Sequence, residues 1–261
     1  MTASSPSSPS PLAQSRDGHV VTLTLCRPPH NFVDAQAMRE LADTLATLDG
    51  DAGCRAIVLA AEGKSFCAGA DFSSVPGGGE AMDPADFYAH ALRLFDNRKP
   101  VVAAVHGAAV GAGVGLALTA DFRVTCEAAR FSVNFNRLGF HPGFGLSHTL
   151  PRLIGAQRAA MLFYTGRRID GREALAIGLA DELVAADEVL ARAQALAAQI
   201  SESAPLAVQS TRATLRADLA QEVRAINRRE LAEQQLQFRS EDFREGVQAM
   251  AERRTPRFNG R

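Results

Sequence analysis

The sequence predicts an α/β fold with parallel strands, and three observations lead to that class. Short continuous apolar runs, at 56–61 and 101–105, have the composition of strands that are buried on both faces. Between such runs, apolar residues recur at the three- and four-residue spacing of helices that face a core. A chain of 261 residues, 46% of them hydrophobic, can bury the core of one large domain. Strands that alternate with helices in one domain are typical of a parallel sheet.

The first elements are bounded by prolines and by a helix cap. Residues 19–26 have a β-rich composition and end at Pro28-Pro29, which a central strand cannot contain. Asp34 has the side chain of a helix N-cap, and apolar residues at helical spacing follow it. These residues are Met38, Leu41, Leu45 and Leu48. The buried run 56–61 comes next, so we expect a strand, a helix and a second strand.

The same order continues along the chain. A helical stretch at 87–97 leads into the strand at 101–105. Residues 111–120 are small enough to form a helix that packs tightly against its neighbours, and a short strand is expected at 122–126. Ala- and Leu-rich helical patterns then extend to the end of the chain, at 190–200, 206–219 and 220–238.

Composition divides the chain into three regions. Residues 1–15 are rich in Ser, Pro and Ala, and we expect them to form a disordered tail. Residues 16–197 are expected to form the α/β core, and residues 198–261 a helical C-terminal region.

Charge, hydropathy and cysteine usage exclude several functional classes. The net charge of −1 argues against a nucleic-acid partner. No apolar run approaches the roughly 18 residues that a membrane span needs, and residues 1–15 do not resemble a signal peptide. The four cysteines form no CxxC pair and have no histidine at metal-ligand spacing, which argues against a zinc site or a disulfide framework. We therefore expect a soluble, cytoplasmic protein without a metal, a membrane anchor or a nucleic-acid partner.

Two loops of small residues are the candidates for chemistry. Residues 65–72 follow the first buried strand closely, and residues 106–115 connect a strand to a helix. Small residues let a ligand approach the backbone and leave N–H groups free to donate. Loops that follow parallel strands meet at the carboxyl ends of those strands, where two N–H donors can form an oxyanion hole.

Two other interpretations of these loops remain open. Taken singly, each loop has the composition of a site where a helix and a strand pack closely. The glycines at 111, 113 and 115 also resemble a dinucleotide-binding fingerprint. The last of them comes one position too early, however, and no acidic residue ends a following strand about 20 residues on, which argues against that fingerprint.

Taken together, the two loops and several later segments carry a resemblance. The sequence resembles the crotonase superfamily, also called the enoyl-CoA hydratase/isomerase family, from about Arg16 to Phe258. The segments that carry it are 27–31, 65–71, 100–107, 110–113, 138–143, 151–155, 162–166, 172–174, 178–181 and 243–246.

The resemblance implies a fold, an assembly and a substrate class. It implies a spiral of ββα units followed by C-terminal helices that build a homotrimer or a dimer of trimers. It also implies an acyl-CoA thioester as substrate, with coenzyme A as part of that substrate and no separate cofactor. The thioester carbonyl would accept hydrogen bonds from the backbone N–H groups of Ala70 and Ala112, which would stabilise an enolate.

The resemblance further implies which residues contact coenzyme A. Ala68, Asp71 and Phe72 match positions that lie along it. The loop that contains His30 would lie near the pantetheine and phosphate portion. Arg253 would reach the phosphates, for which a guanidinium is well suited.

The sequence departs from the family where hydratases carry two glutamates. Those substrate-contacting positions are Gly115 and Phe135 here, and a position that carries an acid in several isomerases is Gly143. Since none of these can transfer a proton, isomerase- or decarboxylase-like chemistry is favoured over simple hydration. His141 is the candidate acid or base, because imidazole titrates near neutral pH.

Alternatives to this interpretation also stay open. The chain would act as a conventional hydratase if another acid, from Glu62, Glu80, Asp83 or Asp86, entered the site. It would be a catalytically inert acyl-CoA-binding protein if the loss of three acids marked a loss of activity.

Overall fold

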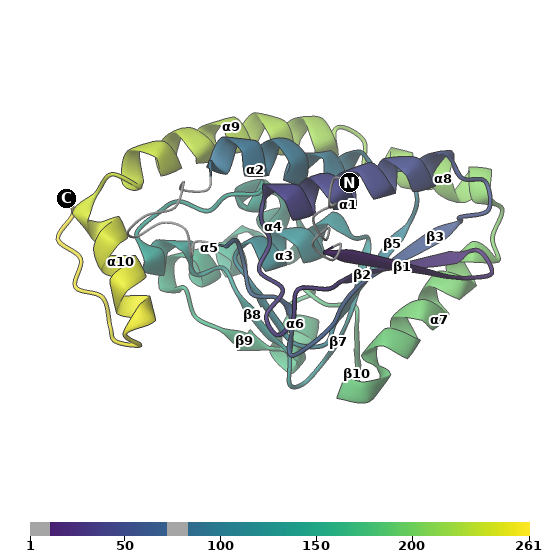
Figure 1. Cartoon of the computed structure of the whole chain (residues 1–261), viewed down its shortest axis with the longest axis horizontal. Helices are drawn as coiled ribbons and strands as arrows, with labels where there is room; N and C mark the ends of the chain where they lie inside the picture. Colours follow the sequence, from purple (N-terminus) through teal and green to yellow (C-terminus); the bar gives the residue numbers. More distant parts are fainter. Residues whose placement is uncertain (1–10, 72–82) are drawn as a thin grey trace, which may run out of the picture.

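The computed structural model describes residues 11–71 and 83–261. Within them, the longer sheet has six strands in the order β1-β2-β3-β5-β7-β10 (Figure 1). Their bounds are β1 Leu12–Asp17, β2 Val20–Leu25, β3 Ala56–Ala61, β5 Val101–Val105, β7 Phe122–Cys126 and β10 Glu182–Val184. All neighbouring pairs are parallel except β1 and β2. The predicted parallel α/β architecture is confirmed.

The second sheet has the described order β4-β6-β8-β9. Its strands are β4 Ser65–Cys67, β6 Ala108–Val110, β8 Arg130–Ser132 and β9 Ile169–Asp170. Strands β3, β5 and β7 lie in the first sheet, and the strand that follows each of them lies in the second. A helix or a helical turn follows each of these pairs of strands. The chain therefore consists of successive ββα units, as the resemblance implied.

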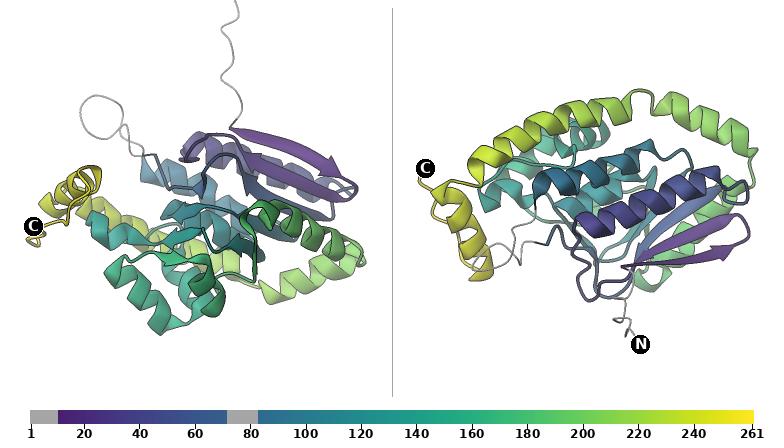
Figure 2. Two further views of the ribbon diagram at one scale, coloured as in Figure 1. Left: turned by 90° about the horizontal axis from the view of Figure 1, so that it is seen from below. Right: turned by 45° about the horizontal axis from the view of Figure 1, so that its top comes forward.

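The helices cover the sheets on both sides. Their bounds are α1 Ala35–Gly50, α2 Pro84–Ala91, α3 Ala112–Thr119, α4 Leu146–Ile154, α5 Ala156–Thr165, α6 Gly171–Ala176, α7 Val189–Ser201, α8 Pro205–Leu215, α9 Leu219–Gln237 and α10 Glu241–Ala251. The described residues also form three short 3-10 helices, at Leu92–Asp96, Asn134–Leu138 and Ala186–Glu188. Figure 2 shows α2 between α9 and α1, with α10 at one end of the molecule. No helix in the described part of the chain is both long and apolar enough to cross a membrane.

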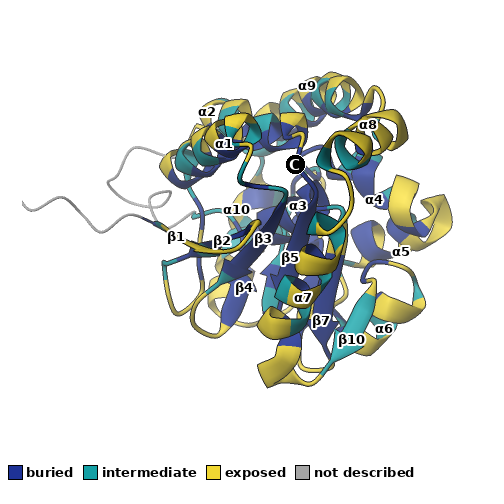
Figure 3. Ribbon diagram, turned by 90° about the vertical axis from the view of Figure 1, so that its right-hand side faces the viewer, coloured by how far each residue is buried: buried dark blue, intermediate teal, exposed yellow. Residues whose placement is uncertain are grey.

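The central strands and the first helix agree with their sequence signals. Strands β3 and β5 coincide with the two apolar runs and are buried (Figure 3). Asp34 caps α1, because its carboxylate accepts a hydrogen bond of 2.8 Å from the N–H of Ala37. The apolar residues at helical spacing after Asp34 face the core.

The N-terminal boundary differs from the prediction. Residues 12–15, which we expected in the tail, belong to β1 and pair with β2 in a hairpin. Gly18 occupies the first position of its two-residue loop with φ +52°, a conformation that such loops favour. Strand β1 is mostly exposed at the sheet edge, so its sequence lacks the apolar alternation that would have revealed it.

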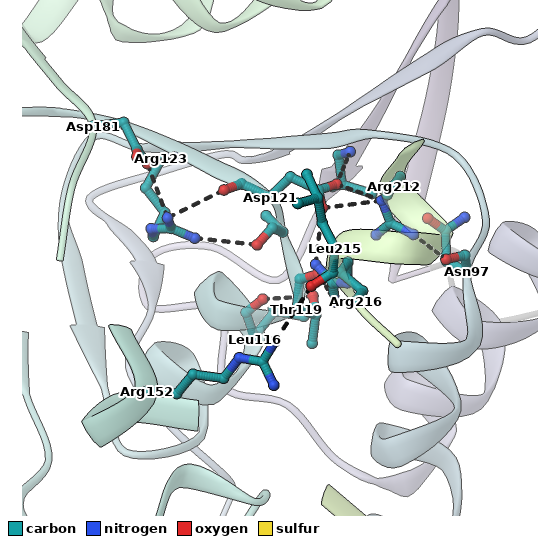
Figure 4. Close-up of polar contacts among 12 residues, drawn as sticks. Asn97, Leu116, Thr119, Asp121, Arg123, Arg152, Asp181, Arg212, Leu215 and Arg216 are labelled. Atoms are coloured by element: carbon teal, nitrogen blue, oxygen red, sulfur yellow. Dashed lines mark hydrogen bonds and ion pairs between the residues drawn. The ribbon is translucent and has the colours of Figure 1, made fainter. Parts of the chain in front are cut away.

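The C-terminal boundary at 197 falls inside a helix. Helix α7 packs on β2, β3, β5 and β7, so all of it belongs to the α/β core. Helix α8 is joined to that core by the charged network in Figure 4. Asp121, before β7, accepts hydrogen bonds from Arg212 at 2.8 Å and from Arg216 at 2.9 Å. Nearby, Arg123 pairs with Asp181 at 2.9 Å.

Candidate active site

The two loops of small residues meet at a close backbone contact. Gly113, in the first turn of α3, faces the carbonyl oxygen of Cys67 at the end of β4. A Cβ atom at Gly113 would lie 2.0 Å from that oxygen, so no other residue fits without a backbone shift. The close-packing interpretation is therefore correct for this glycine, and the packing brings the two loops together.

The backbone N–H groups of Ala70 and Ala112 have no acceptor among residues 11–71 and 83–261. Val33 forms a parallel bridge around Ala70, donating to the carbonyl of Gly69 and accepting from the N–H of Asp71, each at 3.0 Å. Because successive N–H groups of an extended chain alternate in direction, the Ala70 N–H points away from Val33. Ala112 is the first residue of α3, where the N–H has no acceptor within the helix. Neither N–H donates a backbone hydrogen bond in the described chain.

Both alanines line one apolar cavity of about 120 Å³. Aromatic rings form much of its wall, from Phe32, Phe87, Tyr88, Phe135, Phe140, Phe144 and Phe238. Among the described residues that line it, none is Asp, Glu, His, Lys or Cys. The nearby thiol of Cys67 is fully buried, which raises its pKa to about 12 and keeps it protonated.

Comparison with known proteins identifies the family. The model of the enoyl-CoA hydratase/isomerase family matches residues 15–261. The chain belongs to this family. It is therefore an enoyl-CoA hydratase/isomerase-like enzyme, as the resemblance implied.

Relatives and solved structures cover nearly the whole chain. A probable enoyl-CoA hydratase of Bacillus subtilis is 35% identical over 250 residues, which are 94% of this chain and 96% of that protein. A carnitinyl-CoA dehydratase of Proteus mirabilis is 36% identical over 253 residues, with the same coverage. The crystal structure of an enoyl-CoA hydratase/isomerase from Pseudoalteromonas atlantica has a TM-score of 0.87 at 31% identity, covering 95% of this chain and 100% of that one.

The structure shows what surrounds the three positions at which the resemblance led us to expect acids. A Cβ atom at Gly115 would lie 2.6 Å from the ring of Phe144, and one at Gly143 would lie 1.8 Å from the hydroxyl of Tyr88. Phe135 itself lines the cavity. Aromatic side chains thus take the space into which acidic side chains at 115 and 143 would extend.

Two polar residues of the cavity were not predicted from the sequence. Tyr88 comes from α2 and Gln234 from α9, and the Gln234 side-chain amide donates to the Tyr88 hydroxyl at 3.1 Å. Asn227, Glu230 and Gln234 share one buried face of α9. The only signal in the sequence was their spacing of three and four residues, which places them on one face of a helix. Three polar residues on one helix face usually indicate that this face is exposed to solvent, so the sequence did not suggest a buried site.

His141 lies next to this pair without lining the cavity. Its carbonyl oxygen accepts from Gln234 at 2.8 Å, and its ring Nδ1 lies 2.7 Å from the carbonyl oxygen of Pro142. The imidazole is absent from the described cavity wall. Its expected role in proton transfer therefore stays a prediction, without geometric support.

Of the residues expected to contact coenzyme A in this region, one lines the apolar cavity. Ala68 lines the cavity and donates its N–H to the carbonyl oxygen of His30 at 2.9 Å. The His30 side chain is exposed, with its ring against Phe32. Asp71 is half-buried next to the bridge, whereas Phe72 lies outside the described residues.

Arg253 lines a second, polar cavity of about 790 Å³. Asn134 and Met250 line both cavities, so the two cavities are neighbours. Other arginines line the polar one, namely Arg137, Arg167, Arg168 and Arg254. Arg167 is paired with Glu173, and Arg254 with Glu245 and Glu252. Hydrogen bonds from Arg254 and from the N–H of Arg257 lower the pKa of Glu245 to about 2.

Proposed function

We propose that this enzyme binds an acyl-CoA thioester with its carbonyl oxygen between the N–H groups of Ala70 and Ala112, and stabilises the enolate formed there. We further propose isomerase- or decarboxylase-like chemistry rather than hydration. The observation that supports both is one cavity that combines two unused backbone donors with a described wall free of carboxylates.

The two donors would act on charge that develops during the reaction. When the enolate forms, negative charge moves onto the thioester oxygen, and fixed dipoles in an apolar site stabilise it strongly. In decarboxylation, the bond between the α-carbon and the carboxylate breaks, and its electron pair moves toward that oxygen as CO₂ leaves. A proton from solvent then adds to the α-carbon. This sequence needs an electron sink but no protein base, which matches the described wall, whereas an isomerisation would need a base from outside that wall to remove and return a proton.

The polar cavity is the proposed site for the coenzyme A phosphates. Arg137, Arg168 and Arg253 line it and form no ion pair within the described residues, so their guanidinium groups are available to an anion. Its position next to the apolar cavity supports the proposal that one thioester extends across both.

Hydration is the second candidate, since relatives bear the names hydratase and dehydratase. It would require an acid from outside the described cavity wall, such as Glu80 in the segment 72–82.

One experiment separates these reactions. The purified protein is incubated in D₂O with saturated, enoyl and malonyl-type CoA thioesters, and the products are analysed by mass spectrometry. We expect loss of CO₂ or a shifted double bond, with deuterium at the α-carbon. Addition of water to the enoyl ester as the only reaction would favour hydration. No mass change with any ester that binds would contradict the proposal.

We also propose that the chain forms a homotrimer or a dimer of trimers. The C-terminal helices expose large apolar side chains, including Leu206, Leu215 and Leu236, each more than two-thirds accessible in the single chain. Such surface is costly in water and favours association. Sedimentation equilibrium would test this, and a monomer at micromolar concentration would contradict it.

A further inference from the structure

Asn134 lies at the border between the apolar cavity and the polar one. It is the first residue of the 3-10 helix Asn134–Leu138 and lines both cavities. Met250 is the other residue that the two described walls have in common, so Asn134 is the polar side chain that they share. A group in this position can connect the solvent side of the site with the reacting atoms.

The carboxamide of Asn134 is nearly buried and has no hydrogen-bond partner. The residue is 8% exposed, and neither its Oδ1 nor its Nδ2 atom forms a hydrogen bond within residues 11–71 and 83–261. A water molecule can still reach both atoms, in contrast to the Oε1 atom of Gln234, which is sealed inside the protein. Asn134 therefore offers a free donor and a free acceptor at the border of the cavities.

Two other polar side chains of the described apolar wall are engaged with each other. The Gln234 amide donates to the hydroxyl of Tyr88 at 3.1 Å and to the carbonyl oxygen of His141 at 2.8 Å. Tyr88 and Gln234 line the apolar cavity but not the polar one. Asn134 thus differs from them in facing both cavities with hydrogen-bonding atoms that are free.

The proposed reaction needs a proton from solvent at this place. The described apolar wall contains no Asp, Glu, His or Lys that could give one to an enolate. Arg137, Arg168 and Arg253 line the polar cavity and are exposed, so solvent reaches it. Its volume of about 790 Å³ is many times the roughly 30 Å³ of one water molecule, so it can hold water beside part of a ligand.

We propose that Asn134 holds one water molecule and directs its proton to one face of the enolate. The Oδ1 atom accepts one proton of this water, which leaves the other proton free for the α-carbon. The electron pair of the enolate forms the new C–H bond, the O–H bond of the water breaks, and the hydroxide left behind takes a proton from solvent in the polar cavity. Asn134 is thus a positioning residue. This inference rests on the proposed function, because it takes the apolar cavity as the site of the enolate.

A water molecule held on one side makes the protonation stereospecific. An enolate is planar, and free solvent could give it a proton on either face. In decarboxylation the bond to the carboxylate breaks before the proton arrives, so the loss of the held water should affect the configuration of the product more than the release of CO₂.

The decarboxylation of ethylmalonyl-CoA in D₂O tests this proposal. The product, butanoyl-CoA, carries one deuterium at the α-carbon, and NMR of a chiral ester of the acid gives its configuration. If the enzyme shifts a double bond instead, the isomerised ester is analysed in the same way. We expect the unmodified protein to give predominantly one configuration.

Substitution of Asn134 should remove this preference. Asn134→Leu keeps a similar volume without hydrogen-bonding atoms, and we expect a nearly equal mixture of configurations while CO₂ release falls by less than about 10-fold. Asn134→Ser keeps a donor and an acceptor and should restore part of the preference. Asn134→Ala is the second variant if Asn134→Leu folds poorly in thermal unfolding.

The chain offers a matched control two residues further on. Asn136 is exposed and lines neither cavity. Asn136→Leu makes the same chemical change on the same short helix, and we expect it to keep the configuration that the unmodified protein gives.

The outcomes separate this inference from the proposed function. A mixture of configurations from the unmodified protein would overturn only the inference, and so would a single configuration that survives in both Asn134→Leu and Asn134→Ala. Loss of the preference in Tyr88→Phe alone would assign the proton to Tyr88 instead. Weaker binding of free CoA by Asn134→Leu, with the configuration kept, would show that the carboxamide binds coenzyme A.

Two further results would also contradict it. A fall in CO₂ release of 100-fold or more that Asn134→Ser does not reverse would indicate a structural role for Asn134. If no thioester loses CO₂ or shifts its double bond, the proposed function fails, and this inference fails with it.

Discussion

At the scale of single residues, glycines decide what the site contains. Gly113 lets α3 approach β4, while Gly115 and Gly143 make room for Phe144 and Tyr88. An acid introduced at Gly115 would collide with a ring that is itself part of the aromatic core. Restoring a single glutamate is therefore insufficient to rebuild a water-activating site, because the ring of Phe144 has to move as well.

The donor at Ala112 can be removed without disturbing the helix. Proline lacks an N–H and is well tolerated at the first position of a helix, as Pro84 is in α2 and Pro205 in α8. We expect Ala112→Pro to lower kcat by about 100- to 1,000-fold, the usual effect of losing one such donor. Thermal unfolding monitors the fold, and an unchanged kcat in a stable variant would contradict the assigned role.

His141 gives a second test at this scale. Since its imidazole does not line the described cavity, we expect His141→Ala to change kcat by less than about threefold, far below the usual contribution of a general acid or base. Steady-state kinetics with the productive thioester measures this. A 100-fold or greater decrease in kcat, with substrate binding unchanged, would show that His141 takes part in proton transfer.

The residues of the site differ in how far the sequence predicts them. Ala70 and Ala112 were named from the resemblance, which assigns one donor to each of the two loops of small residues. Tyr88 and Gln234 lie 146 positions apart and meet only through the packing of α9 beside α2. No local pattern contains that contact, so it could not be predicted.

At the scale of elements, Glu230 on α9 provides the N-terminal cap of α4. Its carboxylate lies 2.7 Å from the Gly145 N–H and 3.0 Å from the Ser147 N–H, at a helix start that has no side-chain cap of its own. A negative charge there also interacts favourably with the helix dipole.

Removing this carboxylate should destabilise the protein. We expect Glu230→Ala to lower the free energy of unfolding by about 2–3 kcal/mol, since several buried donors lose their acceptor. Urea denaturation measures it. Gln235→Ala, at an exposed position of the same helix, is the control and should change stability by less than about 0.5 kcal/mol.

Elements were predictable where burial leaves a clear apolar run or a helical period in the sequence. Strands β3, β5 and β7 and helix α1 match their sequence signals because one or both faces are buried. Strand β1 was missed because it is polar and is held by backbone pairing to β2. Backbone hydrogen bonds leave little trace in side-chain sequence.

At the scale of the whole molecule, one charged network connects distant parts of the chain. Asp121 joins the start of β7 to α8 through Arg212, and Arg212 also donates to the carbonyl of Asn97 (Figure 4). The side chains of Asp121 and Arg212 are 14% and 10% exposed, so little solvent screens them.

Neutralising Asp121 should therefore be costly. We expect Asp121→Asn to lower the free energy of unfolding by about 3–5 kcal/mol, because two nearly buried guanidinium groups lose their counter-charge. Asp43→Asn breaks an exposed pair with Arg93 and should cost less than about 1 kcal/mol. Equal effects in chemical denaturation would show that the network does not hold α8 to the core.

The aromatic wall of the cavity has a kinetic consequence. No described side chain on it changes protonation near neutrality, since the pKa of Tyr88 is raised and no acid or imidazole lines the wall. Once substrate is bound, the chemical step should therefore have a nearly constant rate from about pH 6 to pH 9, instead of the bell-shaped profile of an acid–base pair. Single-turnover kinetics across this range would reveal a steep limb if an ionising group outside the described wall took part.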